Sequence, residues 1–195
     1  MGKNQEHDHD LEKPSTLGYD ETYIKLSKHR VIFINEDITH QLATELSALL
    51  LYFDNQDQEE PIEMYINSVG GGGDALYNIY DIMQLISAPI KTVCLGKCYS
   101  AAAVILAAGS KGYRYAFKHS NIMIHGLQCS FPILGYDITN SKNYHQFLRE
   151  NNTNIMKILA NHTKQPLAKI HKDCQEDMWL DPVKARSYGI IDHII

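Results

Sequence analysis

Residues 96–109, GKCYSAAAVILAAG, join an apolar strand to an apolar helix and decide the fold class. The strand is expected over KTVCLG (91–96) and the helix over 100–108, where Gly109 ends it. Serine is a preferred residue just before a helix, so Ser100 is expected to cap this one. The same position also surrounds a hydroxyl with unpaired N–H groups and positive potential. The stretch therefore leaves two roles open for Ser100, a helix cap or a nucleophile.

Similar strand and helix patterns alternate along the rest of the chain. Short apolar runs predict strands, and apolar residues recurring every three or four positions predict helices. This alternation predicts a layered α/β fold with a mostly parallel sheet and right-handed crossovers, in a single domain over 21–195. Residues 1–20 are polar and predict a mobile tail. The other expected strands are RVIFI (30–34), MYIN (64–67), GYRYAF (112–117), NIMIH (121–125) and IIDHII (190–195). The other expected helices are one capped by Asp37 or Thr39, one from about Ala75 to Ile86, one over about 139–162, one after Pro166 and one capped by Asp181.

Composition and charge narrow the class of protein. A formal net charge of −5 argues against nucleic acid or an anionic membrane as a partner. The longest apolar run, 101–108, is far shorter than the roughly 20 residues that span a bilayer. The cysteines are scattered and no export signal is recognisable, so we expect reduced thiols and a cytoplasmic or equivalent reducing compartment. Cys94 and Cys98 have the spacing C-x₃-C without a second ligand pair, so we predict no metal and no organic cofactor.

Four consecutive glycines, 70–73, lie between an expected strand and an expected helix. The spacing Gly70-x-Gly72-x-x-Ala75 formally fits a dinucleotide-binding fingerprint, but no acidic residue that would hold a ribose follows the next strand. A flexible turn is the second interpretation. In the third, glycine lets a backbone N–H approach a substrate carbonyl and stabilise its oxyanion. The glycine run by itself does not choose among the three.

One serine, one histidine and one aspartate have the chemistry of a hydrolytic site. His125 ends an apolar strand, where its side chain would reach the rim of the sheet. Asp173 lies on the inward face of its expected helix, and a buried carboxylate needs a partner. Together with Ser100 they would supply a nucleophile, a general base and an orienting acid. Spacing alone does not select Asp173, because other acidic residues lie nearby: Glu176, Asp177 and Asp181.

Over about residues 22–195 the order of these blocks resembles the proteolytic subunit of the Clp protease. The blocks that carry the resemblance are YIKLSKHRVIFI, MYINS with the glycines after it, NIYDIMQLI, the Ser100 block with LAAGSKGYR, IMIH, ILANHTKQPLAKI and ARSYGIIDHII. The resemblance implies that Ser100 is the nucleophile, His125 the base and Asp173 the orienting acid. It also implies that the backbone N–H groups of Gly71 and Ala101 form the oxyanion hole.

The same resemblance implies an architecture and partners. The fold would be a spiral of βαβ units of the Clp protease and crotonase type. Its long protruding helix, here about 139–162, would be used in ring–ring contact. The protein would form a double heptameric ring, of this chain alone or mixed with paralogues, fed by a hexameric AAA+ unfoldase. Its activity would be that of a serine endopeptidase that degrades unfolded polypeptides through an acyl-enzyme.

Several positions depart from the pattern of that family. Val69 replaces the usual proline before the glycines and two further glycines follow, which we expect to loosen the turn. Pro132 lies in a segment that pairs with the peptide substrate in the family, and proline cannot donate a backbone hydrogen bond. Glu63 stands where an aromatic residue often lines the docking pocket for the unfoldase.

Two alternative functions stay open. The departures fit a weakly active or inactive ring subunit of a mixed complex. The glycine turn and the helix that starts at Ser100 also suit an acyl-CoA-binding enzyme of the crotonase kind, in which two backbone N–H groups stabilise a thioester enolate.

Overall fold

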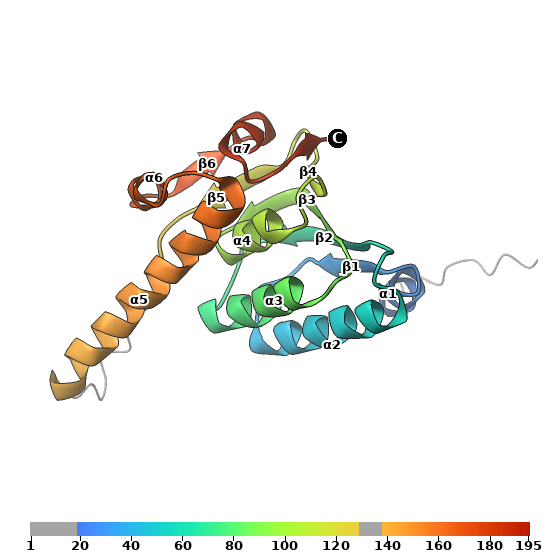
Figure 1. The fold of residues 1–195 in the computed structure, drawn as a ribbon, viewed down its shortest axis with the longest axis horizontal. Coiled ribbons are helices and arrows are strands. Elements are labelled where there is room, and N and C mark those ends of the chain that lie inside the picture. Colours follow the sequence, from blue (N-terminus) through green and yellow to red (C-terminus); the bar gives the residue numbers. More distant parts are fainter. Residues whose placement is uncertain (1–18, 129–137) are drawn as a thin grey trace, which may run out of the picture.

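A computed structural model of the chain describes residues 19–128 and 138–195. Within these ranges seven strands form one sheet, and helices pack around it (Figure 1). The helices are α1 (Tyr19–Ser27), α2 (His40–Gln56), α3 (Gly73–Leu85), α4 (Ala101–Ala108), α5 (Ile138–Thr163), α6 (Leu167–Asp173) and α7 (Pro182–Tyr188). The strands are β1 (Val31–Ile34), β2 (Ile62–Ser68), β3 (Ile90–Tyr99), β4 (Arg114–Ala116), β5 (Asn121–Ile124), β6 (Met178–Leu180) and β7 (His193–Ile194).

The sheet is mostly parallel, as the sequence predicts. The strand order is β1-β2-β3-β4-β7, and all of these neighbours are parallel. β5 pairs in parallel with the last residues of β3, and β6 adds to β5 in the antiparallel direction. Buried and half-buried residues alternate along β2, which is typical of a strand with one face in the core. Figure 1 shows α2 and α3 side by side along the sheet.

An irregularity in β3 divides the sheet into two parts. The register between β2 and β3 shifts between the pairs Ile66–Cys94 and Ser68–Cys98, and Gly96 between them has φ +91°. Before the shift β3 pairs with β4, and after it β3 pairs with β5. The bulge therefore directs the carboxyl end of β3 toward β5 instead of β4.

Helix α4 is the centre of the core. Every side chain from Ala101 to Ala108 is buried, with at most 5% of its surface exposed. A helix that is apolar on all sides has to be enclosed by protein, and α4 packs against α3, α5 and β3. The strand–helix junction at Ser100 is therefore held from both sides.

Helix α5 confirms the predicted long helix and extends away from the rest of the domain in Figure 1. Its 26 residues make it about 40 Å long. Ile155, Met156 and Leu159 near its carboxyl end are buried against the domain, whereas Phe147 is 53% exposed. The domain therefore covers the apolar side chains of α5 only near the carboxyl end of this helix. In the described ranges, no helix combines the length and the apolar character needed to cross a membrane.

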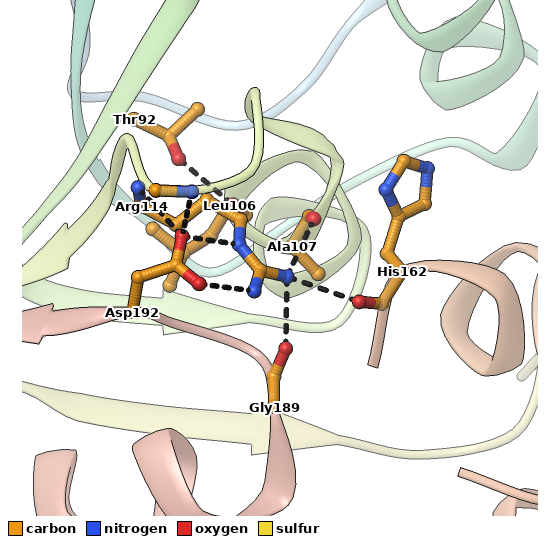
Figure 2. A network of polar contacts seen from close by, with 8 residues as sticks. Thr92, Leu106, Ala107, Arg114, His162, Gly189 and Asp192 are labelled. Atoms are coloured by element: carbon orange, nitrogen blue, oxygen red, sulfur yellow. Dashed lines mark hydrogen bonds and ion pairs between the residues drawn. The ribbon is translucent and has the colours of Figure 1, made fainter. Parts of the chain in front are cut away.

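The buried guanidinium of Arg114 ties the C-terminal segment to the core (Figure 2). It holds both carboxylate oxygens of Asp192, with Nη2–Oδ1 at 2.6 Å and Nε–Oδ2 at 2.8 Å. Its Nη1 donates to the carbonyl oxygens of Gly189 (2.8 Å), His162 (3.2 Å) and Ala107 (3.3 Å). These carbonyls lie at or near the ends of α7, α5 and α4, so one side chain connects three helices.

Two elements were missed by the sequence analysis. Helix α1 begins at Tyr19, inside the predicted tail, and packs on β1 through the rings of Tyr23 and Phe33, 5.4 Å apart. Strand β6 has three residues, too few to show a period. The remainder of the predicted tail, 1–18, lies outside the described residues.

Candidate active site

Ser100 connects β3 to α4 in a strained conformation. Its φ of 55° and ψ of −124° lie outside the regions that a residue with a side chain prefers, at a cost of about 1–3 kcal/mol. Ser100 is the N-cap residue of α4, as expected, but its hydroxyl makes no capping hydrogen bond to the helix. Strained turns between a strand and a helix present the nucleophilic serine hydroxyl in α/β-hydrolases. The conformation of Ser100 matches that arrangement.

Gly70 brings the glycine turn against Ser100. A Cβ added to Gly70 would lie 2.7 Å from the carbonyl oxygen of Tyr99 and 2.8 Å from Cβ of Ser100, and its φ is +98°. Glycine is therefore required here both for space and for backbone conformation. This close approach excludes the second interpretation of the glycine run, that of a flexible turn.

The turn is held by Ile38, which corrects the expectation that the extra glycines loosen it. The N–H of Ile38 donates to the carbonyl of Gly70 (2.8 Å), and the N–H of Gly72 donates to the carbonyl of Ile38 (3.0 Å). Gly71 lies between these two bonds. Within the described residues, neither the N–H of Gly71 nor that of Ala101 has an acceptor. Both predicted oxyanion donors are therefore free to bind a substrate oxygen.

His125 follows β5 directly and lines the same cavity as Ser100. The parallel pairing of Tyr99 with Met123 brings the carboxyl ends of β3 and β5 together. The side chain of His125 is 12% exposed, and its buried Nδ1 has no hydrogen-bond partner among the described residues. Oδ1 of Asp177 lies 3.7 Å from this Nδ1. Asp177 precedes Met178, the antiparallel partner of Ile124.

Asp173 lies at the end of α6, and its hydrogen bonds go elsewhere. Its Oδ2 accepts from the hydroxyl of Tyr188 at 2.7 Å and from the ammonium of Lys169. Burial raises the pKa of the Asp173 carboxyl, but the hydrogen bonds from Lys169 and Tyr188 outweigh it and hold the pKa below its usual range. Within the described residues no hydrogen bond joins Asp173 to His125.

The backbone nevertheless keeps Asp173 near the histidine. The N–H of Gly126 donates to the carbonyl oxygen of Cys174 at 2.9 Å. His125 immediately precedes Gly126, and Asp173 immediately precedes Cys174. The side chains of His125 and Asp173 therefore extend from two segments that this hydrogen bond joins. Ser100, His125, Gly71 and Ala101 thus line one cavity, and Asp173 is not part of its lining.

The cavity itself has a volume of about 370 Å³, and its walls present polar and apolar surface in about equal parts. Its apolar lining includes Val69, Leu76, Val104, Leu127, Ile155 and Leu159. The loop after His125 is held in place by Asn152 of α5, whose Oδ1 accepts from the N–H of Leu127 at 2.8 Å. An apolar side chain of a peptide would fit against these walls. The predicted substrate-pairing segment with Pro132 lies outside the described residues.

Sequence reasoning missed the aromatic residues beside this site. Tyr188 contacts Asp173, and Tyr99 lines the cavity with its ring edge-on to Trp179, 5.0 Å between centroids. An aromatic residue adjacent to the serine and another near the end of the chain carry no periodic signal that identifies such a role. Among the described residues, no cluster of three or more His, Cys, Asp or Glu side chains is suited to hold a metal ion.

The comparison with protein families agrees with the fold and with the resemblance found in the sequence. A family model described as Clp protease matches residues 16–195, nearly the whole chain. The match covers all the residues that line the cavity and the whole of the long helix α5. The chain therefore belongs to the Clp protease family, whose members are peptidases that generally form oligomeric rings.

Proposed function

We propose that this chain is a serine endopeptidase subunit that cleaves unfolded polypeptides. The observation that carries the proposal is the strained Ser100, whose hydroxyl is not used to cap α4 and opens into the cavity that His125 also lines. The N–H groups of Gly71 and Ala101, which have no acceptor among the described residues, line the same cavity. The family match favours peptide cleavage over the acyl-CoA alternative.

The proposed reaction proceeds in two steps. Oγ of Ser100 attacks the carbonyl carbon of the scissile bond while Nε2 of His125 takes the hydroxyl proton. The N–H groups of Gly71 and Ala101 stabilise the oxyanion, and the amine leaves with the proton from the imidazolium. Water, deprotonated by His125, then hydrolyses the acyl-enzyme and frees Ser100. Asp173 is proposed to accept from Nδ1 and to hold the reactive tautomer.

Within the described residues Asp173 makes no hydrogen bond to His125, which suggests that ring assembly completes the site. A buried Nδ1 without an acceptor costs about 1–3 kcal/mol, so a shift that pairs it is favourable. We propose a double heptameric ring, in which the uncovered part of α5 around Phe147 contacts the opposite ring. Ring contact would act on α5, and α5 packs against α6, which carries Asp173.

The partnership with an unfoldase rests on a site that differs from the family pattern. Glu63 is paired with Lys91, Nζ–Oε1 at 3.1 Å, and accepts from the hydroxyl of Tyr65 at 3.0 Å. A hexameric unfoldase that docks here has to match an ion pair in place of an aromatic residue. We also propose a reducing compartment, because Cys94, Cys98 and Cys174 are free thiols in this structure.

A fluorophosphonate that reacts with activated serines tests the peptidase proposal. Assembled protein and its Ser100→Ala variant are treated side by side, and intact mass is measured. We expect one adduct on the unchanged chain and none on the variant. An adduct of equal amount on both chains would remove Ser100 from the role of nucleophile.

A second candidate, an inactive ring subunit, is favoured by the position of Asp173. In this structure Lys169 and Tyr188 hold Oδ2 of Asp173, and within the described residues no hydrogen bond joins Asp173 to His125. The same experiment separates the two functions. Folded, assembled rings that give no adduct and release no product from a fluorogenic peptide would favour the inactive subunit.

A further inference from the structure

We propose that Tyr188 is a positioning residue for the catalytic acid: it holds Oδ2 of Asp173 so that Oδ1 is directed to Nδ1 of His125. This inference rests on the proposed peptidase function and assigns a role to a residue outside the predicted triad.

The contacts of Asp173 are all on one oxygen. The Tyr188 hydroxyl and the Lys169 ammonium both donate to Oδ2, and Oδ1 has no partner in the described part of the chain. A carboxylate anchored through one oxygen can still accept from a histidine through the other. Nδ1 of His125 is the buried polar atom nearby that lacks a partner.

Tyr188 is suited to hold the carboxylate because it is itself rigid. It ends α7 and is only 6% exposed, and its carbonyl oxygen accepts from Nε2 of Gln165 at 3.0 Å. The next carbonyl, that of Gly189, accepts from Arg114 at 2.8 Å. Burial and the neighbouring Asp173 raise the pKa of Tyr188 far above its usual value, so the phenol stays a donor. Its position is therefore set by the core.

Lys169 occupies a different place in this arrangement. Its side chain is 44% exposed, and its ammonium lies 4.3 Å from the centre of the Tyr188 ring. A flexible, partly solvated cation defines the direction of a carboxylate less sharply than a buried phenol does. Lys169 neutralises the acid, whereas Tyr188 orients it.

Asp177 is the competitor for the same histidine. Its Oδ1 lies 3.7 Å from Nδ1 of His125, beyond hydrogen-bonding distance, and its side chain is 45% exposed. No hydrogen bond to the Asp177 side chain is present within the described residues. A solvated carboxylate has to reorganise during the reaction, which a preorganised one avoids. Asp177 is the closer carboxylate in this structure, but the anchored Asp173 needs less reorganisation once a shift brings it to His125, so we assign the role of the acid to Asp173.

A double-mutant cycle on assembled protein tests this role. Turnover of a fluorogenic peptide is measured for Tyr188→Phe, Asp173→Asn and the double variant, with Tyr80→Phe as the matched control. Tyr80 is also a half-buried tyrosine with a hydrogen-bonded hydroxyl, 3.2 Å from Nε2 of His162, away from the cavity. We expect Tyr188→Phe to lower kcat about 10- to 100-fold with KM unchanged, and Tyr80→Phe to lower neither.

The decisive readout is coupling. Because Tyr188 acts through Asp173, adding Tyr188→Phe to Asp173→Asn is expected to cause no further loss of kcat. Losses that multiply would mean a merely structural tyrosine and would overturn the proposal. So would full activity of Tyr188→Phe, or a larger loss of kcat in Asp177→Asn than in Asp173→Asn.

Two further variants keep the test decisive. If Tyr188→Phe does not assemble, Lys169→Met leaves Tyr188 as the donor to Oδ2 and is expected to lower kcat less than Asp173→Asn does; a loss as large as in Asp173→Asn would assign the positioning to Lys169. Ser100→Ala identifies failure of the proposed function, because full turnover by that variant ends the peptidase proposal itself. If Ser100→Ala is inactive while Tyr188→Phe keeps full activity, only the proposed role of Tyr188 is contradicted.

Discussion

The N–H of Ser100 donates to the carbonyl oxygen of Met123 at 2.9 Å, which ties the candidate nucleophile to the strand that carries His125 two residues later. This bond continues the parallel pairing of β3 with β5 beyond Tyr99. The serine and the histidine are therefore placed by sheet register, whereas the acid is placed by contacts of α6 and α7. Predictions about the two halves of the site differ accordingly.

Gly70→Ala is expected to abolish reaction at Ser100. The new Cβ would meet Tyr99 and Ser100 within 2.8 Å, and a φ of +98° adds strain. The displaced turn would lose an oxyanion donor, and we expect the rate of fluorophosphonate labelling to fall about 100-fold or more. Gly112→Ala is the matched control, because Gly112 has φ +86° but no atom within 4 Å of the new Cβ. Equal labelling rates in the two variants would contradict the prediction.

Breaking the pair of Arg114 and Asp192 is expected to unfold the domain more readily. Arg114→Met leaves the partly buried carboxylate of Asp192 without its cation, at a cost of up to about 3–5 kcal/mol in the free energy of unfolding. Urea denaturation followed by circular dichroism measures the loss. Lys111→Met, at an exposed lysine nearby, is the control. A loss below about 1 kcal/mol in Arg114→Met would contradict the importance of the pair.

The same pair predicts a pH dependence of stability. Burial raises the pKa of Asp192, but the hydrogen bonds from Arg114 outweigh it and lower the pKa below 3.8. A lowered pKa in the folded state means that the stabilisation is present above pH 3.8 and is lost as the pH falls through the folded-state pKa. Unfolding curves at several acidic pH values check this, with Asp192→Asn as the comparison. The unchanged chain should lose stability more steeply than the variant.

Trp179 should report on reaction at Ser100 through its fluorescence. It is the one tryptophan of the chain, is 55% exposed, and packs edge-on against Tyr99 beside the serine. An adduct at Ser100 that covers the indole would exclude water from it and shift its emission to shorter wavelength. The shift should be absent in Ser100→Ala. An emission spectrum unchanged by complete labelling would show that the adduct does not reach the aromatic pair.

Cys174 should resist alkylation although it is adjacent to Asp173. Burial and the Asp173 carboxylate raise its pKa to about 11, so only about one molecule in a thousand carries the thiolate at pH 8. Peptide mass spectrometry after brief iodoacetamide treatment measures the modified fraction. Treatment in urea serves as the control and should modify Cys174 fully. Rapid alkylation in the folded protein would mean that the segment after α6 opens readily.

Local patterns predicted most of the secondary structure. Thr39 caps α2 by accepting from the N–H of Leu42, and Asp181 caps α7 in the same way through Lys184. These are short-range interactions between residues three apart, which sequence can show. The bulge in β3 and the three residues of β6 depend on neighbouring strands instead. No pattern within a short stretch of sequence predicts this bulge or this strand.

The sequence by itself determined the α/β class, the long helix, and a serine and a histidine at the ends of strands, because these depend on periodicity and on local chain direction. Tertiary structure alone decided that the hydroxyl of Ser100 does not cap α4, since the strain there comes from packing against Gly70 and β5. It also decided where the Asp173 carboxylate is held. The donors to Asp173 come from two helices, so packing between helices fixes the position of this carboxylate, and spacing along the chain does not.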